Sequence, residues 1–189
     1  MDASFCPGAK ALRQPKPEFF SCPKCGEEVE IWTDEIKRNC SLCGTAVFRN
    51  QKMSCVQWCS YAEECVGRKT LTEYMENQKV SIKNILIKEI KKYFSEKTGC
   101  IEESLSALRE GENLLSERSG DWHIVIPACI IHKIENRKVR KKILLKSGLR
   151  ETQADQICSI IDGLFDSKGI MENNMKIVHD ATLYGKKQS

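Results

Sequence analysis

Four cysteines near the start of the chain have the spacing of a metal site. In FSCPKCGEEVEIWTDEIKRNCSLCG, two residues separate Cys22 from Cys25, and the same spacing recurs between Cys40 and Cys43 after fourteen intervening residues. A two-residue gap lets one tight turn direct two thiolates at the same ion, and Zn²⁺ prefers four soft ligands in a tetrahedron. Because all four ligands come from the protein, we expect a structural site that holds zinc, with iron as the alternative.

Four further cysteines are candidates for a second site. Cys55 and Cys59 would share one face of a helix, Cys65 lies near the end of that helix, and Cys6 could complete a four-thiolate set. Three interpretations stay open. The cluster could hold a second metal, either zinc or an iron-sulfur cluster, it could pack a small hydrophobic helix, or it could have a disulfide or redox role.

The composition is that of a globular protein with reduced thiols. Hydrophobic residues make up 41% of the 189 residues and charged residues 30%, which argues against a disordered chain. The eleven cysteines are an odd number, which argues against complete pairing into disulfides. No apolar run approaches the roughly 18 residues of a membrane span, and the first residues lack the apolar stretch of a signal peptide. We therefore expect a cytoplasmic protein without a membrane segment.

The formal charge of +4 is a weak basic bias. Dedicated nucleic-acid binders usually carry more positive charge, and thiolates bound to zinc would lower the total further. The segment between the cysteine pairs carries Trp32 among charges of both signs, which suits contact with a protein. A protein partner is therefore expected ahead of nucleic acid.

The elements around the cysteines favour β structure, and those after them favour helix. VEIWTDEI between the cysteine pairs is a β-rich segment, and TAVFRN follows the second pair. Together they predict a small β unit, which resembles a zinc ribbon of the rubredoxin-like kind. The predicted organisation is an irregular arm (1–18), the zinc ribbon (19–50), a Cys-rich helical linker with a helix over 53–67 (51–70), and a helical domain (71–189).

Apolar residues recur at helical spacing through the rest of the chain. The helices are predicted over 79–97, 101–117, 121–134, 138–147 and 151–164, with a last one that begins near 173. Glycines fall at the joints and are expected to end helices: Gly99, Gly120, Gly148, Gly163 and Gly169. The predicted fold class is mostly α, a helical bundle with a small N-terminal β ribbon.

Two helical stretches, residues 103–135 and 177–185, resemble parts of the HD superfamily of metal-dependent phosphohydrolases. The run IVIPACIIHKIE matches the helix that ends in the family's His-Asp pair, and IVHDATLYG matches its last motif. The resemblance implies an HD-like helical domain over roughly residues 80–185. It places His132 at the family's paired histidine and Asp180 at its final aspartate.

Two other family positions carry different residues here. Glu103 stands where the family has its first histidine, and Lys133 stands where it has the paired aspartate. A lysine removes a ligand and adds a cation, so the resemblance implies a degenerate site without a catalytic metal. A metal held by Glu103, His132 and Asp180, and a placement wrong by one helical turn, stay as alternatives. An ion pair of Lys133 with Glu103 or Asp180 is the packing hypothesis.

Three functions follow as expectations. The first is a metal-binding adaptor or regulatory protein that docks onto another protein through the ribbon and the Cys-rich helix. In this case the basic run RKVRKKILLK beside the HD-like pocket could bind a nucleotide or phosphate without hydrolysing it. The second is an active HD-type phosphohydrolase with an altered ligand set. The third is an iron-sulfur or redox-handling protein that uses the second cysteine cluster.

Overall fold

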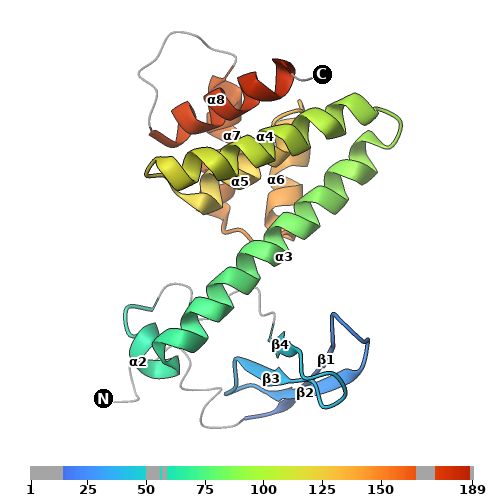
Figure 1. Ribbon diagram of the computed structural model, residues 1–189, viewed down its shortest axis with the longest axis vertical. Helices are drawn as coiled ribbons and strands as arrows, with labels where there is room; N and C mark the ends of the chain where they lie inside the picture. Colours follow the sequence, from blue (N-terminus) through green and yellow to red (C-terminus); the bar gives the residue numbers. More distant parts are fainter. Residues whose placement is uncertain (1–14, 50–55, 57–58, 165–172, 188–189) are drawn as a thin grey trace. The chain divides into compact units, whose positions relative to one another are not determined.

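The computed structural model describes residues 15–49, 56, 59–164 and 173–187 (Figure 1). The chain divides into two compact units, Met1–Gln78 and Lys79–Ser189. The first unit holds the strands that the described residues form, and the second is helical. The predicted fold class, mostly α with a small N-terminal β part, is confirmed.

The first unit contains four short strands in two antiparallel hairpins: β1 (Pro17–Ser21) with β2 (Glu28–Trp32), and β3 (Lys37–Asn39) with β4 (Ala46–Phe48). In β2 and β4 buried side chains alternate with more exposed ones, as expected for strands covered on one face. Val29, Ile31 and Val47 are buried and pack with Cys22 and Cys40. The small core of the ribbon therefore lies directly beside the sulfur atoms.

The ribbon begins earlier than predicted. β1 starts at Pro17, inside the predicted irregular arm. A proline is tolerated there because it is the first residue of an edge strand, where its missing N–H removes no ladder hydrogen bond. Trp32, the last residue of β2, pairs with Pro17 across the hairpin and is partly buried.

The described residues of the first unit also include a short helix and the start of a longer one. Within the described residues the predicted Cys-rich helix is reduced to α2 (Ala62–Val66), and Gly67 follows it with a φ of +81°. The next helix, α3 (Arg68–Phe94), begins well before residue 79, the predicted start. Its first turns carry Leu71 and Tyr74, which pack in a separate small core with Ala62 and Phe48. That short apolar stripe explains the early start, because it packs against residues of the first unit.

Helices alone form the described part of the second unit, which contains the end of α3 and five further helices. These are α4 (Thr98–Glu117), α5 (Trp122–Ile131), α6 (Arg137–Lys146), α7 (Glu151–Gly163) and α8 (Asn173–Lys187). The bounds predicted for these five helices are therefore confirmed to within a few residues. Among the described helices, none combines the length and the apolar character that crossing a bilayer requires.

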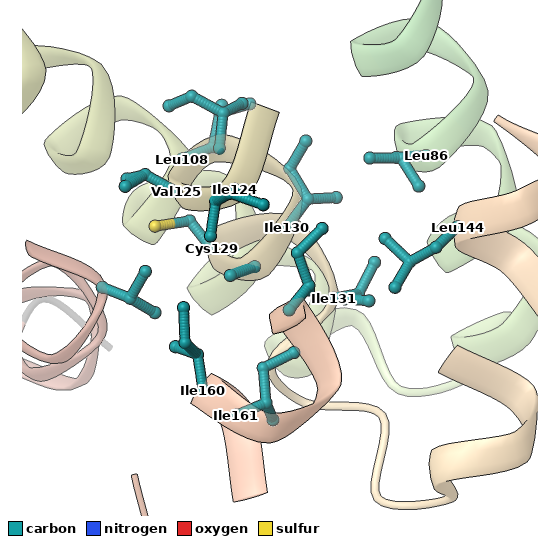
Figure 2. Close-up of a cluster of buried hydrophobic side chains, with 14 of the residues drawn as sticks. Leu86, Leu108, Ile124, Val125, Cys129, Ile130, Ile131, Leu144, Ile160 and Ile161 are labelled. Carbon is teal, nitrogen blue, oxygen red and sulfur yellow. The ribbon is translucent and has the colours of Figure 1, made fainter. Parts of the chain in front are cut away.

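The central helix of this unit is α5, which is apolar on every side. All eight residues from Ile124 to Ile131 are buried, as expected for a helix with neighbours all round. Figure 2 shows side chains of α5 among those of Leu86 from α3, Leu108 from α4, Leu144 from α6, and Ile160 and Ile161 from α7. The other helices therefore keep their polar faces outward and turn their apolar faces to α5.

Two glycines show how closely the helices approach and turn. A Cβ at Gly111 of α4 would lie 2.9 Å from the Sγ of Cys129 on α5, so the two helices touch where a side chain is missing. Gly148 follows α6 with a φ of +96°, which confirms the predicted helix end there. Gly99 lies inside α4, so the prediction that it ends a helix was wrong.

Candidate metal centre

The four cysteines of the ribbon come together at one point. Their Sγ atoms all lie within 4.8 Å of one another. The Sγ atoms of Cys22 and Cys43 are 3.6 Å apart, and those of Cys25 and Cys40 are 3.5 Å apart. A sulfur tetrahedron with zinc about 2.3 Å from each corner has edges of about 3.8 Å, whereas a disulfide has an S–S bond of about 2.05 Å. The spacing therefore fits four ligands of one ion and excludes two disulfides.

Two equivalent turns bring these sulfurs together. In each turn the N–H of a glycine donates to the carbonyl of the first cysteine at 2.9 Å, from Gly26 to Cys22 and from Gly44 to Cys40. Both glycines have positive φ, +79° and +71°, a backbone conformation that residues other than glycine rarely adopt. The sequence Cys-x2-Cys-Gly thus determines the turn as well as the ligands.

The surroundings shift the pKa values of Cys43 and Cys25 in opposite directions. Hydrogen bonds from the hydroxyl and the backbone of Thr45 lower the pKa of Cys43 to about 6, and its Sγ lies 3.3 Å from Thr45 Oγ1. A backbone hydrogen bond from Glu27 lowers the pKa of Cys25, but loss of hydration and the neighbouring sulfurs outweigh it and raise that pKa to about 12. The neighbouring sulfurs thus favour the thiolate at Cys43 and oppose it at Cys25, whereas a divalent cation would favour the thiolate at each position. The donor set therefore fits a metal.

The second cysteine cluster is described only in part. Cys59 is partly buried and packs against the core of Val56, Ala62 and Tyr74, whereas Cys65 is exposed. Cys6 and Cys55 lie outside the described residues. Packing thus accounts for Cys59, and a second metal site or iron-sulfur cluster stays a prediction.

His132, Glu103 and Lys133 lie close together in the helical unit. His132 ends α5 and is 8% exposed, and its Nδ1 lies 2.8 Å from the carbonyl oxygen of Cys129 in the same helix. Lys133 forms an ion pair with Glu103 of α4. Of the two partners expected for Lys133, the structure therefore selects Glu103.

Asp180 lies elsewhere. Its carboxylate accepts a hydrogen bond of 2.6 Å from Arg118, the residue that ends α4, and this contact lowers the pKa of Asp180. Arg118 follows Glu103 by fifteen residues along the same helix, or about 22 Å at 1.5 Å per residue. Glu103 and Asp180 are thus too far apart to hold one ion. Among the described residues, no cluster of three potential metal ligands forms apart from the four ribbon cysteines.

Carboxylates neutralise much of the basic run on α6. Arg137 and the buried Arg140 both pair with Asp162 of α7. Lys141 pairs with Glu151 and Asp155 of the same helix at 3.0 and 2.8 Å. These cations join two helices, so they are less available to a phosphate ligand than the sequence suggested.

Three residues of these sites were missed by the sequence analysis. Thr45 directly follows the second Cys-x2-Cys-Gly turn, so its hydroxyl could have been expected near a sulfur. Arg118 and Asp162 carry no local signal, because their partners are 62 and 22 to 25 residues away in sequence.

In comparisons with protein-family models, curated proteins and solved structures, the chain has no match.

Proposed function

We propose that this chain is a zinc-binding protein whose ribbon docks onto another protein and whose helical unit has no catalytic role. The observation that carries the proposal is the gathering of four cysteine sulfurs within 4.8 Å of one another. Four protein ligands fill a tetrahedral site, so no position remains for a water molecule or a substrate. Such a site stabilises a fold and does no chemistry of its own.

Zinc is proposed ahead of iron because it is the usual metal of closed four-cysteine sites in small β modules. The test is metal analysis, combined with a visible absorption spectrum, of protein purified without oxygen. We expect one zinc per chain and no visible chromophore. Cys25→Ser should lose the metal, whereas Cys100→Ser, a matched change in the helical unit, should keep it. Iron with a visible chromophore would contradict the proposal for zinc.

Two exposed apolar side chains on the ribbon support a docking role. Leu42 lies between the cysteines of the second turn and is 70% exposed, and Phe19 of β1 is 58% exposed. Large apolar side chains at this exposure are common in interfaces. Leu42→Ser should abolish binding of an identified partner to the purified chain without loss of zinc. Leu183→Ser, which changes an exposed leucine of α8, should leave that binding intact.

The absence of catalysis is proposed from the two ion pairs of the HD-like positions. Lys133 neutralises Glu103, and Arg118 neutralises Asp180. Assays with Mn²⁺, Ni²⁺ and Fe²⁺ against nucleotides and phosphomonoesters should therefore show no turnover. Activity that disappears in both His132→Ala and Asp180→Ala would instead support an HD-type phosphohydrolase.

The thiols are consistent with a reducing compartment, and we propose the cytoplasm. The nine cysteines of the described residues are free of disulfides, and reduced thiols persist in cytosolic proteins. Metal ligation by cysteine needs the same reducing conditions.

A further inference from the structure

Positive charge is concentrated in the helical unit. Residues 79–189 contain twenty lysines and arginines against fifteen aspartates and glutamates, a net charge of +5, whereas residues 1–78 contain ten against eleven, a net charge of −1. The chain total of +4 therefore understates the charge of the helical unit. Zinc bound to four thiolates would increase the difference.

The basic run on α6 separates into two sets of side chains. Arg137, Arg140 and Lys141 face α7 and pair with its carboxylates. Lys138 and Lys142 are exposed and form no ion pair with any described residue. They are four residues apart, so they lie on the same face of the helix. Lys146, a further four residues along, extends this row.

Helix α3 adds two lysines to the same region. Lys146 donates to Glu89 of α3 at 2.6 Å with 59% of its own side chain exposed. Lys88 and Lys92 of α3 are exposed. The pKa of Glu89 is lowered mainly by Lys146 and to a smaller extent by the positive charges of Lys92 and Lys88. One carboxylate thus lies among three lysines, and positive charge remains in excess.

We propose that this lysine face binds the phosphate backbone of a nucleic acid. The lysine face consists of Lys88, Lys92, Lys138, Lys142 and Lys146. The three lysines of α6 extend over about 12 Å of helix axis, a length in which one strand of a duplex carries about three or four phosphates. Lysine is a flexible point charge and does not recognise a base edge in the bidentate manner of arginine. Binding should therefore be independent of sequence.

The surroundings of the face favour nucleic acid over a membrane or an acidic protein. A helix that lies in a membrane surface needs a continuous apolar face beside its lysines. Beside the lysine face only Tyr93 of α3, 45% exposed, and Leu145 of α6, 39% exposed, are large exposed apolar residues among those described. A protein interface likewise needs an apolar centre. The phosphate backbone needs positive charge alone.

The lysine face ends where α3 ends. A cavity of about 400 Å³ lies there, lined among others by Lys97 and Lys133 and by Glu96 and Glu135. Two cations and two carboxylates balance, so this cavity adds no net charge. The face is thus limited to the surfaces of α3 and α6 that meet at Glu89.

The test measures binding of the full zinc-loaded chain to labelled single-stranded and double-stranded oligonucleotides over a series of salt concentrations. The logarithm of the affinity should fall with the logarithm of salt concentration at a slope near −4 for duplex, from about 0.9 per phosphate neutralised. Lys138→Gln/Lys142→Gln should weaken binding at least tenfold at low salt and reduce the slope by about two. Oligonucleotides of different sequence should bind alike.

The matched control is Arg109→Gln/Lys176→Gln, which removes two exposed cations from α4 and α8. Equal losses in both double variants would show an effect of net charge alone and overturn the proposal. No binding to either kind of nucleic acid, or binding to vesicles of anionic lipid instead, would also overturn it. The zinc-free Cys25→Ser variant should keep its affinity. If the Cys25→Ser variant lost its affinity for nucleic acid, the binding site would lie on the ribbon, and the proposal for the lysine face would be wrong.

Discussion

Lys133 at the end of α5 and Glu103 in the first turns of α4 form an ion pair in which each side chain is only 21% exposed. The resemblance proposed from the sequence would place both residues at positions where the HD superfamily has metal ligands. A cation from the protein thus lies against the one substituted position that could have served as an oxygen ligand. The pair links α4 to the turn that follows α5.

Removing either partner should destabilise the helical unit, because it leaves the other charge poorly hydrated. We expect Lys133→Ala to lower the free energy of unfolding by about 1–3 kcal/mol, between the values for exposed and buried pairs. Lys133→Asp should cost more, because it places two carboxylates together. Lys83→Ala, which breaks the more exposed pair with Glu112, should cost less than about 1 kcal/mol.

The same variants also test whether this site can bind Mn²⁺. Thermal unfolding of Lys133→Asp should not change when Mn²⁺ is added, because Asp180 is held by Arg118 at the far end of α4. A Mn²⁺-dependent rise in the unfolding temperature of this variant, absent from Lys133→Ala, would show that a metal site can be restored.

The contact between Gly111 and Cys129 predicts a rescue by a second substitution. Alanine is preferred to glycine inside a helix by about 1 kcal/mol, but a Cβ at residue 111 would overlap the sulfur of Cys129. Gly111→Ala should therefore destabilise, by about 1–3 kcal/mol. In Gly111→Ala/Cys129→Ala the nearest atom becomes the Cδ1 of Ile126, at an ordinary 3.5 Å.

Chemical denaturation of the two single variants and the double variant checks this. The double variant should be more stable than the sum of the single effects predicts. Additive effects would mean that the helices move apart to admit the methyl group.

Asp162 should be far more important to stability than other carboxylates of α7. Its loss leaves Arg140, which is 3% exposed, as an uncompensated buried charge, so Asp162→Asn should cost about 3–5 kcal/mol. Asp155→Asn is the control, because Lys141 keeps its pair with Glu151. That change should cost less than about 1 kcal/mol. Similar losses in the two variants would contradict the structural role of Arg140.

His123 makes stability depend on pH. Burial lowers its pKa, and Lys79 and Arg150 add to this, although Asp121 on the preceding turn opposes them. Since the folded pKa lies below the unfolded value of about 6.5, the unfolded state takes up a proton first as the pH falls. The contribution is thus fully present above about pH 6.5 and is lost as the pH falls through the folded pKa.

The measurement is the unfolding temperature between about pH 7.5 and pH 5, in wild type and in His123→Gln. The wild type should lose more stability over this range, because the variant lacks the titrating group. Parallel profiles would show that His123 does not contribute.

Removal of the metal should affect the two units unequally. A chelator that strips the ribbon should abolish the order of the two hairpins, because their small core includes Cys22 and Cys40 and small metal modules depend on their ion for folding. The helical circular dichroism of the second unit should persist, because its core contains none of the ribbon cysteines. Loss of all helical signal at the same chelator concentration would contradict this.

Local patterns in the sequence determined much of the fold. The Cys-x2-Cys-Gly repeats, each with its own turn, predicted the sulfur cluster, and the 3.6-residue periodicity placed the helices of the second unit. The start of α3 was not predicted, because its apolar stripe is short: Leu71 and Tyr74 pack in the small core that they share with Ala62 and Phe48 of the first unit.

The arrangement of the remaining candidates could not be predicted in the same way. Asp180 and His132 each fit a motif, but only the packing of α8 on α4 decides that Asp180 meets Arg118. Likewise, the sequence showed that RKVRKKILLK contains six cations, but it did not show which of them face α7. Contacts between helices depend on the rotation of each helix, and a local pattern does not fix that rotation.

The position of the ribbon cysteines in the chain has a consequence for synthesis. All four are translated, together with both hairpins, before any helix of the second unit, and chains emerge from the ribosome N-terminal end first. The ribbon can therefore capture its ion and fold while the rest is still being made. The helical core has to wait for Ile177 and Val178 of α8, which are among its last parts. A cell short of the metal would thus expose the unfolded ribbon to proteases at the earliest stage of the protein's life.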